Sequence, residues 1–241
     1  VKNNNFEPII ERFKIETYNP DSTAVVLEVG KFFVEDVPML GPLSDSQRKN
    51  FGIKGLDGGR SFIKHMKAYP SNVEVRHVLT FKGSDLPDNQ LTGTLSIEMN
   101  QSFIELPEEP WQPRYYDDRV SYFSLSQIDY SADEQKAARK RYITRWRLDP
   151  SDMEAYKRGE LVEPKKPIVY YIDPATPEKW RPYLNQGVED WQSAFEAAGF
   201  KNAIIAKDPP SKEEDPEWSP EDVRYSVIRY VSTEIQNAMG P

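Results

Sequence analysis

Apolar and polar residues alternate along several segments in the first half of the chain. Residues 73–81 place apolar side chains and His77 at every second position, which is the pattern of a strand with one buried face. Similar alternation predicts strands over residues 92–106 and 120–130, and residues 24–34 are rich in the Val and Phe that strands favour. Because Pro and Asp cluster between these segments as turn residues, we expect this half to form a largely antiparallel β-sheet.

Three segments before residue 142 have helical spacing instead. They comprise residues 44–49, 61–69 and 135–141. The four residues 131–134, Ser-Ala-Asp-Glu, match a capping box, in which the serine and glutamate side chains would satisfy amides at the start of the third helix. In the second segment an apolar stripe is formed by Phe62, Ile63, Met66 and Tyr69. Three short helices are therefore expected in this part.

The second half of the chain predicts a different order of elements. A strand over residues 142–148 is followed by a short helix that opens at Asp149-Pro150, where proline needs no amide hydrogen. Gly159 can close this helix. The charged, proline-containing residues 160–167 are expected to link two domains.

A strand, a long helix and two more strands are expected after this linker. The strands comprise residues 168–172, 203–206 and 225–231, and the helix comprises residues 178–198, with Gly199 as its left-handed stop. An apolar stripe centred on Trp191 is formed by Trp180, Tyr183, Leu184, Gly187, Val188, Trp191, Ala194, Phe195 and Ala198. We expect the stripe to be buried on the sheet, in a strand, helix, strand unit with a right-handed crossover.

Length, charge and composition narrow the class of protein. A chain of 241 residues fits one large or two modest domains, and 12% aromatic residues are enough for a folded core. The 39 acidic and 31 basic residues give a net charge of −8, which opposes a nucleic-acid partner. The chain has no Cys, so it cannot form disulfides, thiolate zinc sites or a cysteine nucleophile. No apolar stretch approaches the roughly 18 residues that cross a bilayer, so no membrane-spanning segment is expected.

The two histidines do not form a metal-binding pair in the sequence. They are His65 and His77, and neither begins a His-Glu-x-x-His motif. His77 lies on the apolar side of its predicted strand, so a core histidine is favoured over a metal ligand. His65 lies off the apolar stripe of its predicted helix and is expected to be solvated.

Two other groups of residues are expected to belong to loops. The acids of residues 208–222 lack the spacing and the central Gly of a calcium loop, so we favour a solvated loop over a cation site. The glycines at 52, 55, 58 and 59 lack the spacing and the following Lys-Ser/Thr of a phosphate loop, so they are expected to be turn glycines. The acids in question are Asp208, Glu213, Glu214, Asp215, Glu217, Glu221 and Asp222, and the glycines are Gly52, Gly55, Gly58 and Gly59.

The sequence contains no motif that is specific for a hydrolase. There is no Gly-x-Ser-x-Gly elbow, and carboxylate pairs of the glycosidase kind are left open, because spacing gives them no preference. Three tryptophans lie outside the predicted long helix, and we favour core packing over a ligand platform for each. The carboxylates are Glu98, Glu105, Glu189 and Asp190, and the tryptophans are Trp111, Trp146 and Trp218. No catalytic, cofactor-binding or metal-binding residue is therefore predicted in this chain.

Several long blocks resemble a large family of zinc-dependent metalloproteases of metzincin-like type. The blocks that carry the resemblance are "DEQKAARKRYITRWRLDP", "GELVEPKKPIVYYIDPATPEKWRPYLNQGVEDWQSAFEAAGF" and "WSPEDVRYSVIRYVSTEIQNAMGP". Earlier pieces, "NNFEPII", "FFVEDVPMLGPLS", "GLDGGRSFIKHMKAYPSNVEVRHVLTF" and "SIEMNQS", are similar to the poorly characterised domain that precedes the protease in that family.

The resemblance implies an α+β fold in two parts. Residues 1–164 would form a β-rich accessory domain, trimmed at its N-terminus, and residues 165–241 the front part of a catalytic domain. That part would be an incomplete α/β upper subdomain of the order strand, helix, strand, strand. The family's zinc helix would lie beyond residue 241, so zinc and a protein or peptide substrate are implied for the parent protein only, and this chain is expected to be inactive.

Two further expectations follow from the resemblance. The parent would be extracytoplasmic, that is periplasmic, cell-surface or secreted, although this chain carries no targeting signal. A chain that ends after the last predicted strand would leave a sheet edge exposed, through which two copies could associate. The alternative to a peptidase fragment is a stand-alone β-rich module that recognises a surface glycan or protein.

Overall fold

The computed structural model describes residues 10–87, 91–131 and 133–232. By contacts the chain divides into two compact units, unit 1 with residues 1–106 and 127–139, and unit 2 with the rest. Strands dominate the elements of these described ranges, so the prediction of a β-rich α+β fold is confirmed. The expected domain boundary after residue 164 lies inside unit 2 and stays a prediction.

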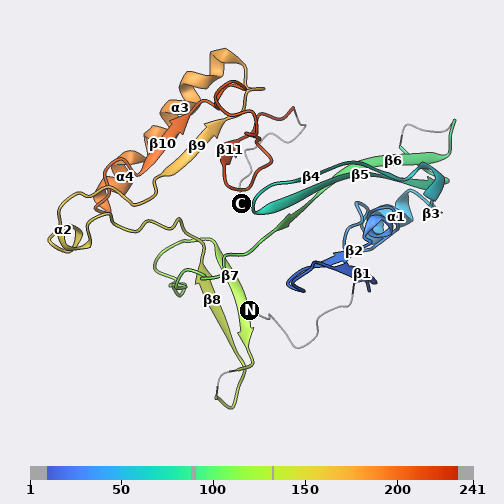
Figure 1. The fold of residues 1–241 in the computed structure, drawn as a ribbon, viewed down its shortest axis with the longest axis horizontal. Helices are drawn as coiled ribbons and strands as arrows, with labels where there is room; N and C mark the ends of the chain where they lie inside the picture. Colours follow the sequence, from blue (N-terminus) through green and yellow to red (C-terminus); the bar gives the residue numbers. More distant parts are fainter. Residues whose placement is uncertain (1–9, 88–90, 132, 233–241) are drawn as a thin grey trace. The chain divides into compact units, whose positions relative to one another are not determined.

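The sheet of unit 1 is built around one long strand, β5, Asn72–Gly83 (Figure 1). The strand β6, Thr94–Ile104, pairs antiparallel with β5 along almost its whole length. The strands β3, Ile53–Leu56, and β4, Phe62–Ala68, share the other edge of β5 and are also antiparallel to it. The strands predicted over 73–81 and 92–106 are therefore confirmed.

The alternation in β5 separates an apolar face from a polar face. Val75, His77, Leu79 and Phe81 are buried on one face, where the register places apolar residues of β6 beside them. The core on this face includes Leu43, Leu79 and Phe81, with the apolar β6 residues Leu95, Ile97 and Met99 packed against it. The opposite face of β5 and β6 carries polar side chains, as is common for an antiparallel sheet with one face on a core.

The helix α1, Asp45–Asn50, confirms the helix predicted over residues 44–49. Ser44 caps it, because its hydroxyl accepts a hydrogen bond from the amide of Gln47 while the Gln47 side chain binds the amide of Ser44. Residues 24–34, predicted as strand, contain only the short β2, Val25–Leu27, followed by the 3-10 helix η1, Gly30–Phe33. The strand β1, Ile15–Tyr18, pairs antiparallel with β2.

The helix predicted over residues 61–69 is wrong, because this segment forms β4. A bulge lies between Ile63 and His65, where the register against β5 shifts by one residue. An extra residue in a strand reverses the alternation beyond it, so the apolar residues of β4 follow no clean period of two. The 3-10 helix η2, Gly58–Arg60, precedes the strand.

The helix predicted over residues 135–141 is also wrong. The strand β8, Ala138–Ile143, pairs instead with β7, Ser124–Asp129, in a two-stranded sheet. The expected capping box is not formed, because the Ser131 hydroxyl donates to the Asp129 carboxylate at 2.7 Å. Local helix propensity is a weak preference, and strand pairing overrides it here. The strand predicted over 120–130 is shorter than expected, and the strand predicted over 142–148 is wrong except at its first two residues, which end β8.

Unit 2 contains a three-stranded parallel sheet with the strand order β10-β9-β11. The central strand β9, Ile168–Ile172, pairs with β10, Ile204–Lys207, on one side and with β11, Ser226–Ile228, on the other. The expected order of strand, helix, strand, strand is therefore confirmed. Figure 1 shows the helices between β9 and β10 lying along the sheet.

The long helix predicted over residues 178–198 is broken into three pieces. They are the 3-10 helix η3, Glu178–Trp180, and the α-helices α3, Arg181–Glu189, and α4, Gln192–Ala197. The predicted stripe consists of two neighbouring rows, offset by one residue. One row, with Val188 and Phe195, packs on Ile168 and Ile204 of the sheet.

The other row of the stripe is exposed, so the expected burial of Trp191 is wrong. Trp191 is 63% exposed, and Trp180 and Tyr183 of the same row are exposed too. Successive residues of a helix differ by about 100° in direction, so one small sheet cannot cover both rows.

The segment between β8 and β9 contains one short helix and packs on the end of α4 and the start of β10. The helix α2, Met153–Lys157, starts at Asp152, which caps it, and not at Asp149 as predicted. Gly159, with a φ of +84°, ends it as expected, and Gly199, with a φ of +92°, ends α4. Val162 of the predicted linker is buried with Ala155, Phe200 and Ala203.

Among the helices of the described ranges, none has the length and apolar character needed to span a bilayer.

Candidate functional site

His77 is a core residue, as predicted. Its side chain is fully buried, and Nδ1 lies 2.5 Å from the carbonyl oxygen of Phe33. Because a carbonyl can only accept, Nδ1 carries the proton, and the buried Nε2 has no hydrogen-bond partner among the described residues. Burial lowers the pKa of His77 and so favours the neutral ring. His65 is exposed on β4, where Ile63 and not His65 lies opposite His77, so the two rings do not converge.

The acidic segment 208–222 is only partly the solvated loop that was predicted. Most of its acids are exposed, but Asp222 is buried and holds the guanidinium of Arg224 at 2.6 Å. Trp218 of the same segment is also buried, 6% exposed, which confirms the core interpretation for this tryptophan. The segment is therefore anchored to unit 2 by its second half.

The carboxylates left open for glycosidase chemistry divide between the two units, with Glu98 and Glu105 in unit 1 and Glu189 and Asp190 in unit 2. Glu98 forms an ion pair with Lys64 at 2.6 Å, which lowers the pKa of Glu98. Asp190 lies in unit 2, where it accepts a hydrogen bond from Gln186. Within residues 10–87, 91–131 and 133–232, no three His, Cys, Asp or Glu side chains gather as a metal-holding group.

The four glycines predicted as turn glycines occupy turns or irregular backbone. Gly52 has a φ of +56° directly after α1, and Gly55 has a φ of +152° beside the register shift of β3. Gly58 and Gly59 lie in η2. The turn interpretation therefore agrees with the places of Gly52, Gly58 and Gly59, but it is wrong for Gly55, which lies inside the strand β3.

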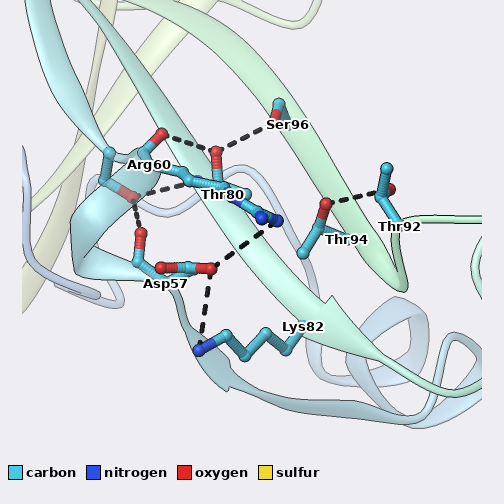
Figure 2. Close-up of polar contacts among 8 residues, drawn as sticks. Asp57, Arg60, Thr80, Lys82, Thr92, Thr94 and Ser96 are labelled. Carbon is cyan, nitrogen blue, oxygen red and sulfur yellow. Dashed lines mark hydrogen bonds and ion pairs between the residues drawn. The ribbon is translucent and has the colours of Figure 1, made fainter.

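A polar cluster surrounds η2 on the polar face of unit 1 (Figure 2). The Asp57 carboxylate lies 3.6 Å from Lys82 Nζ and 3.9 Å from the Arg60 guanidinium. The Thr80 hydroxyl donates to the Arg60 carbonyl at 2.7 Å and bonds the Ser96 hydroxyl at 2.8 Å. Because these groups bind backbone atoms and one another, the cluster fastens η2 to the sheet and offers no activated nucleophile.

A buried carboxylate was not predicted on the same face of unit 1. Glu74 accepts hydrogen bonds of 2.6 Å from the side chains of Asn72, Asn100 and Ser102. Three neutral donors satisfy the oxygens of this buried acid, as burial requires. Period-two alternation places Glu74 on the polar side of β5, but the sequence gives no sign that this side is covered there.

A cavity of about 660 Å³ in unit 2 combines aromatic and cationic side chains. We call it the Trp111 pocket. Residues of three segments line it, among them Trp111, Arg114, Tyr122, Arg145, Trp146 and Trp191. Its apolar walls include core residues of unit 2, such as Phe195 and Phe200.

Two segments that run side by side position the pocket's cations. Ile143 donates its amide hydrogen to the carbonyl of Arg114, and Tyr116 donates to the carbonyl of Arg141, each at 3.0 Å. The rings of Tyr115 and Tyr142 stack at 5.4 Å between these bonds. This alignment places residues 114–116 along residues 141–143.

The guanidinium of Arg145 lies on the face of the Trp111 ring, with Cζ 3.4 Å from the ring centre. Burial lowers the pKa of Arg145, and the nearby positive charge of Arg114 lowers it further, while Tyr122 and Asp149 act in the opposite direction. Arg147 has its own partner, because its Nε lies 2.9 Å from the Asp149 carboxylate. The pocket therefore places two arginines, Arg114 and Arg145, and one aspartate, Asp149, beside aromatic rings in a chain that is acidic overall.

Sequence reasoning found the tryptophans of this pocket but not its arginines. Trp146 is 47% exposed, so the core interpretation is wrong for it, whereas Trp111 is partly buried under Arg145. A signal existed in residues 141–147, Arg-Tyr-Ile-Thr-Arg-Trp-Arg, where arginines and aromatics are interleaved. A second hollow, of about 650 Å³, lies beside it and shares Trp146.

The fold is that of a strand-rich α+β protein, and unit 2 carries a cavity lined by aromatic and charged side chains. A family model described as "Domain of unknown function (DUF5117)" matches residues 1–151, which is more than half of the chain. The chain belongs to this family. The matched residues include Trp111, Arg114 and Arg145. Searches among curated proteins and among solved structures found no match.

Proposed function

We propose that this chain supplies non-catalytic parts of a zinc-dependent metalloendopeptidase. Residues 1–164 would be its accessory domain and residues 165–241 the front part of its catalytic domain. The resemblance of the blocks around Trp146 and Asp173 to metzincin-like proteases is the basis of the proposal. The observation that supports it best is the parallel β10-β9-β11 sheet with α3 on one face, because this is the element order that the resemblance implies.

The side chains of the described residues do not fit a zinc site. His77 is buried in the core of unit 1, and His65 is exposed and does not lie opposite it in the sheet. A zinc site needs several donors that converge on one point. In this proposal the zinc ligands belong to residues of the parent outside this sequence, and no hydrolytic step is assigned to this chain.

The proposal extends to the substrate and the compartment. The substrate of the parent would be a protein or peptide, and the parent would act outside the cytoplasm. Both statements rest on the resemblance alone.

The test is a comparison of this chain with a longer polypeptide from the same reading frame. We expect the longer protein to contain a His-Glu-x-x-His motif, bind one zinc ion and cleave a peptide library, and this chain alone to cleave none. Replacing the motif's glutamate with glutamine serves as the control, since it should abolish cleavage and retain zinc. A longer protein without the motif or without cleavage would refute the proposal.

The alternative is a binding module that recognises a glycan or a protein. The exposed tryptophans Trp146 and Trp191 favour it, because half-exposed indoles are common in binding surfaces. A longer protein that binds a ligand and hydrolyses no peptide would support this alternative.

A further inference from the structure

Two arginines and one aspartate line the Trp111 pocket, and the carboxylate of the aspartate, Asp149, is already paired with Arg147 at 2.9 Å. Arg114 and Arg145 both line the cavity, and within the described part of the chain neither forms an ion pair with an Asp or Glu. Neighbouring cations with the same charge repel each other, and partial burial strengthens the repulsion. An anion bound between them would remove this repulsion.

The stacking of Arg145 leaves its hydrogen-bond donors available. Its guanidinium lies against the Trp111 ring, so the ring contacts the flat face of the group. The N–H groups of a guanidinium point outward in its plane, where they match the two oxygens of a carboxylate. Trp111 thus holds Arg145 in a fixed orientation without occupying its donors.

The remainder of the pocket suits a flat apolar body. Trp146 and Trp191 are both partly exposed and lie on its wall, together with Tyr122 and Met153. Aromatic rings pack on such side chains at an edge or a face. The volume of about 660 Å³ lies within the range of small-ligand sites.

We propose that the Trp111 pocket binds an organic carboxylate attached to an aromatic ring, with Arg114 and Arg145 as the carboxylate donors. Such a group exists in free aromatic acids and at the end of a peptide whose last residue is aromatic. The inference goes beyond the function proposed above and does not depend on it, since binding can be measured without any peptidase activity.

The experiment titrates the 241-residue chain with N-acetylphenylalanine by calorimetry, in low salt at pH 7. The matched control ligand is N-acetylphenylalanine amide, which has the same ring and no charge. We expect the acid to bind at least tenfold more tightly than the amide, and its affinity to fall as salt is added. Sodium acetate has the carboxylate without the aromatic ring, so it tests whether the ring contributes to binding. It should bind at least tenfold more weakly than N-acetylphenylalanine.

Variants locate the binding site. Arg114→Gln and Arg145→Gln should each weaken binding of the acid about tenfold and leave binding of the amide unchanged. Arg139→Gln makes the same change of charge at an exposed arginine of β8 outside the pocket, and it should bind as the unchanged chain does. Arg114 is exposed, so Arg114→Gln should fold normally. It therefore tests the proposal even if Arg145→Gln, which removes the guanidinium stacked on Trp111, disturbs the fold of unit 2.

A tetrapeptide, Ala-Ala-Ala-Phe with a free C-terminus, distinguishes the two sources of the ligand. Tighter binding of the tetrapeptide than of N-acetylphenylalanine assigns the pocket to peptide ends, and equal or weaker binding assigns it to free aromatic acids. The proposal is overturned if neither acid binds, if acid and amide bind equally, or if Arg139→Gln weakens binding as much as Arg145→Gln.

Discussion

The imidazole of His77 and the carbonyl oxygen of Phe33, 44 residues apart in the sequence, are joined by a hydrogen bond of 2.5 Å. The Phe33 ring also packs edge-on against the imidazole, with the ring centres 5.8 Å apart. The bond connects η1 to the central strand β5 of unit 1. Because the imidazole is fully buried and its Nε2 has no partner in the part of the chain that the structure describes, protonation of His77 in the folded state is unfavourable.

We expect His77 to make unit 1 sensitive to acid. The pKa of His77 is lowered in the folded state, whereas a histidine in the unfolded chain has a pKa of about 6.5. Below that pH the unfolded chain binds more protons than the folded chain, so the free energy of unfolding falls as the pH drops until His77 also titrates in the folded state. Urea midpoints at pH 7.5 and 5.5 should therefore differ less for His77→Gln than for the unchanged chain.

The other histidine provides the control for this experiment. His65 is exposed on β4, so replacing it leaves the buried imidazole of His77 and its bond to Phe33 in place. His65→Gln should keep the full difference between the two pH values. If His77→Gln lost as much stability on acidification as the unchanged chain, titration of other groups would account for the effect.

The exposure of two tryptophans predicts opposite outcomes for the same substitution. Trp218 is buried and its ring packs on Tyr171 and Tyr225, so Trp218→Ala should destabilise unit 2 by about 3–5 kcal/mol. Trp191 is exposed, so Trp191→Ala should change the free energy of unfolding by less than about 1 kcal/mol. Thermal and urea unfolding measure both. A large loss from Trp191→Ala would mean that its row of the helix is buried in solution.

Two glycines of the helical region predict opposite signs on replacement by alanine. Gly187 lies inside α3, and a methyl group added there would meet nothing within 4 Å, so Gly187→Ala should stabilise the protein by about 0.5–1 kcal/mol. Gly199 has a φ of +92°, and a Cβ there would lie 2.7 Å from the Tyr156 ring. Gly199→Ala should therefore destabilise by more than about 1 kcal/mol. Urea unfolding of the two variants measures both changes.

A third glycine separates backbone strain from steric clash. Gly159 also has a positive φ, +84°, but a Cβ there would meet nothing within 4 Å. Gly159→Ala should cost only the backbone strain, about 1 kcal/mol, and the extra loss at Gly199 measures the clash with Tyr156. Equal losses at the two positions would show that the Tyr156 ring moves aside freely.

Regular alternation made the long strands β5 and β6 predictable. An interrupted pattern is the reason why β4 was predicted as a helix. β5 keeps its period from Val75 to Phe81, since Val75, Leu79 and Phe81 are all buried on one face of the sheet. In β4 the bulge after Ile63 shifts the alternation, so the apolar residues fit helical spacing by chance. A bulge depends on pairing with β5, which lies in a different part of the sequence. Local patterns therefore carry no information about it.

The Trp111 pocket could not be predicted from the sequence for a related reason. Trp111 and Arg145 are 34 positions apart (145 − 111), and they come into contact next to the pairing of residues 114–116 with 141–143. Sequence alone assigned Trp111 and Trp146 to the core, since most tryptophans are largely buried. Only the position of Arg114 and Arg145 on the same cavity shows that the two indoles line a charged site.

The order β10-β9-β11 predicts a gradient of backbone protection across the sheet of unit 2. β9 has a paired strand on both sides, whereas β11 has three residues and, among the described residues, a strand partner on one side. Amides of β9 should therefore exchange hydrogen much more slowly than those of β11. If two copies associate through this edge, as the exposed strand permits, protection of β11 should rise with protein concentration.

Hydrogen exchange measured at two protein concentrations, about tenfold apart, tests both statements. β5 of unit 1 is the internal control, because it is paired on both sides along most of its length and its protection should not depend on concentration. A rise at β11 that is absent from β5 would place self-association at this edge, since general association would change both strands. Equal and concentration-independent protection of β9 and β11 would contradict both the gradient and the association, and would mean that the outer edge of β11 is covered within a single chain.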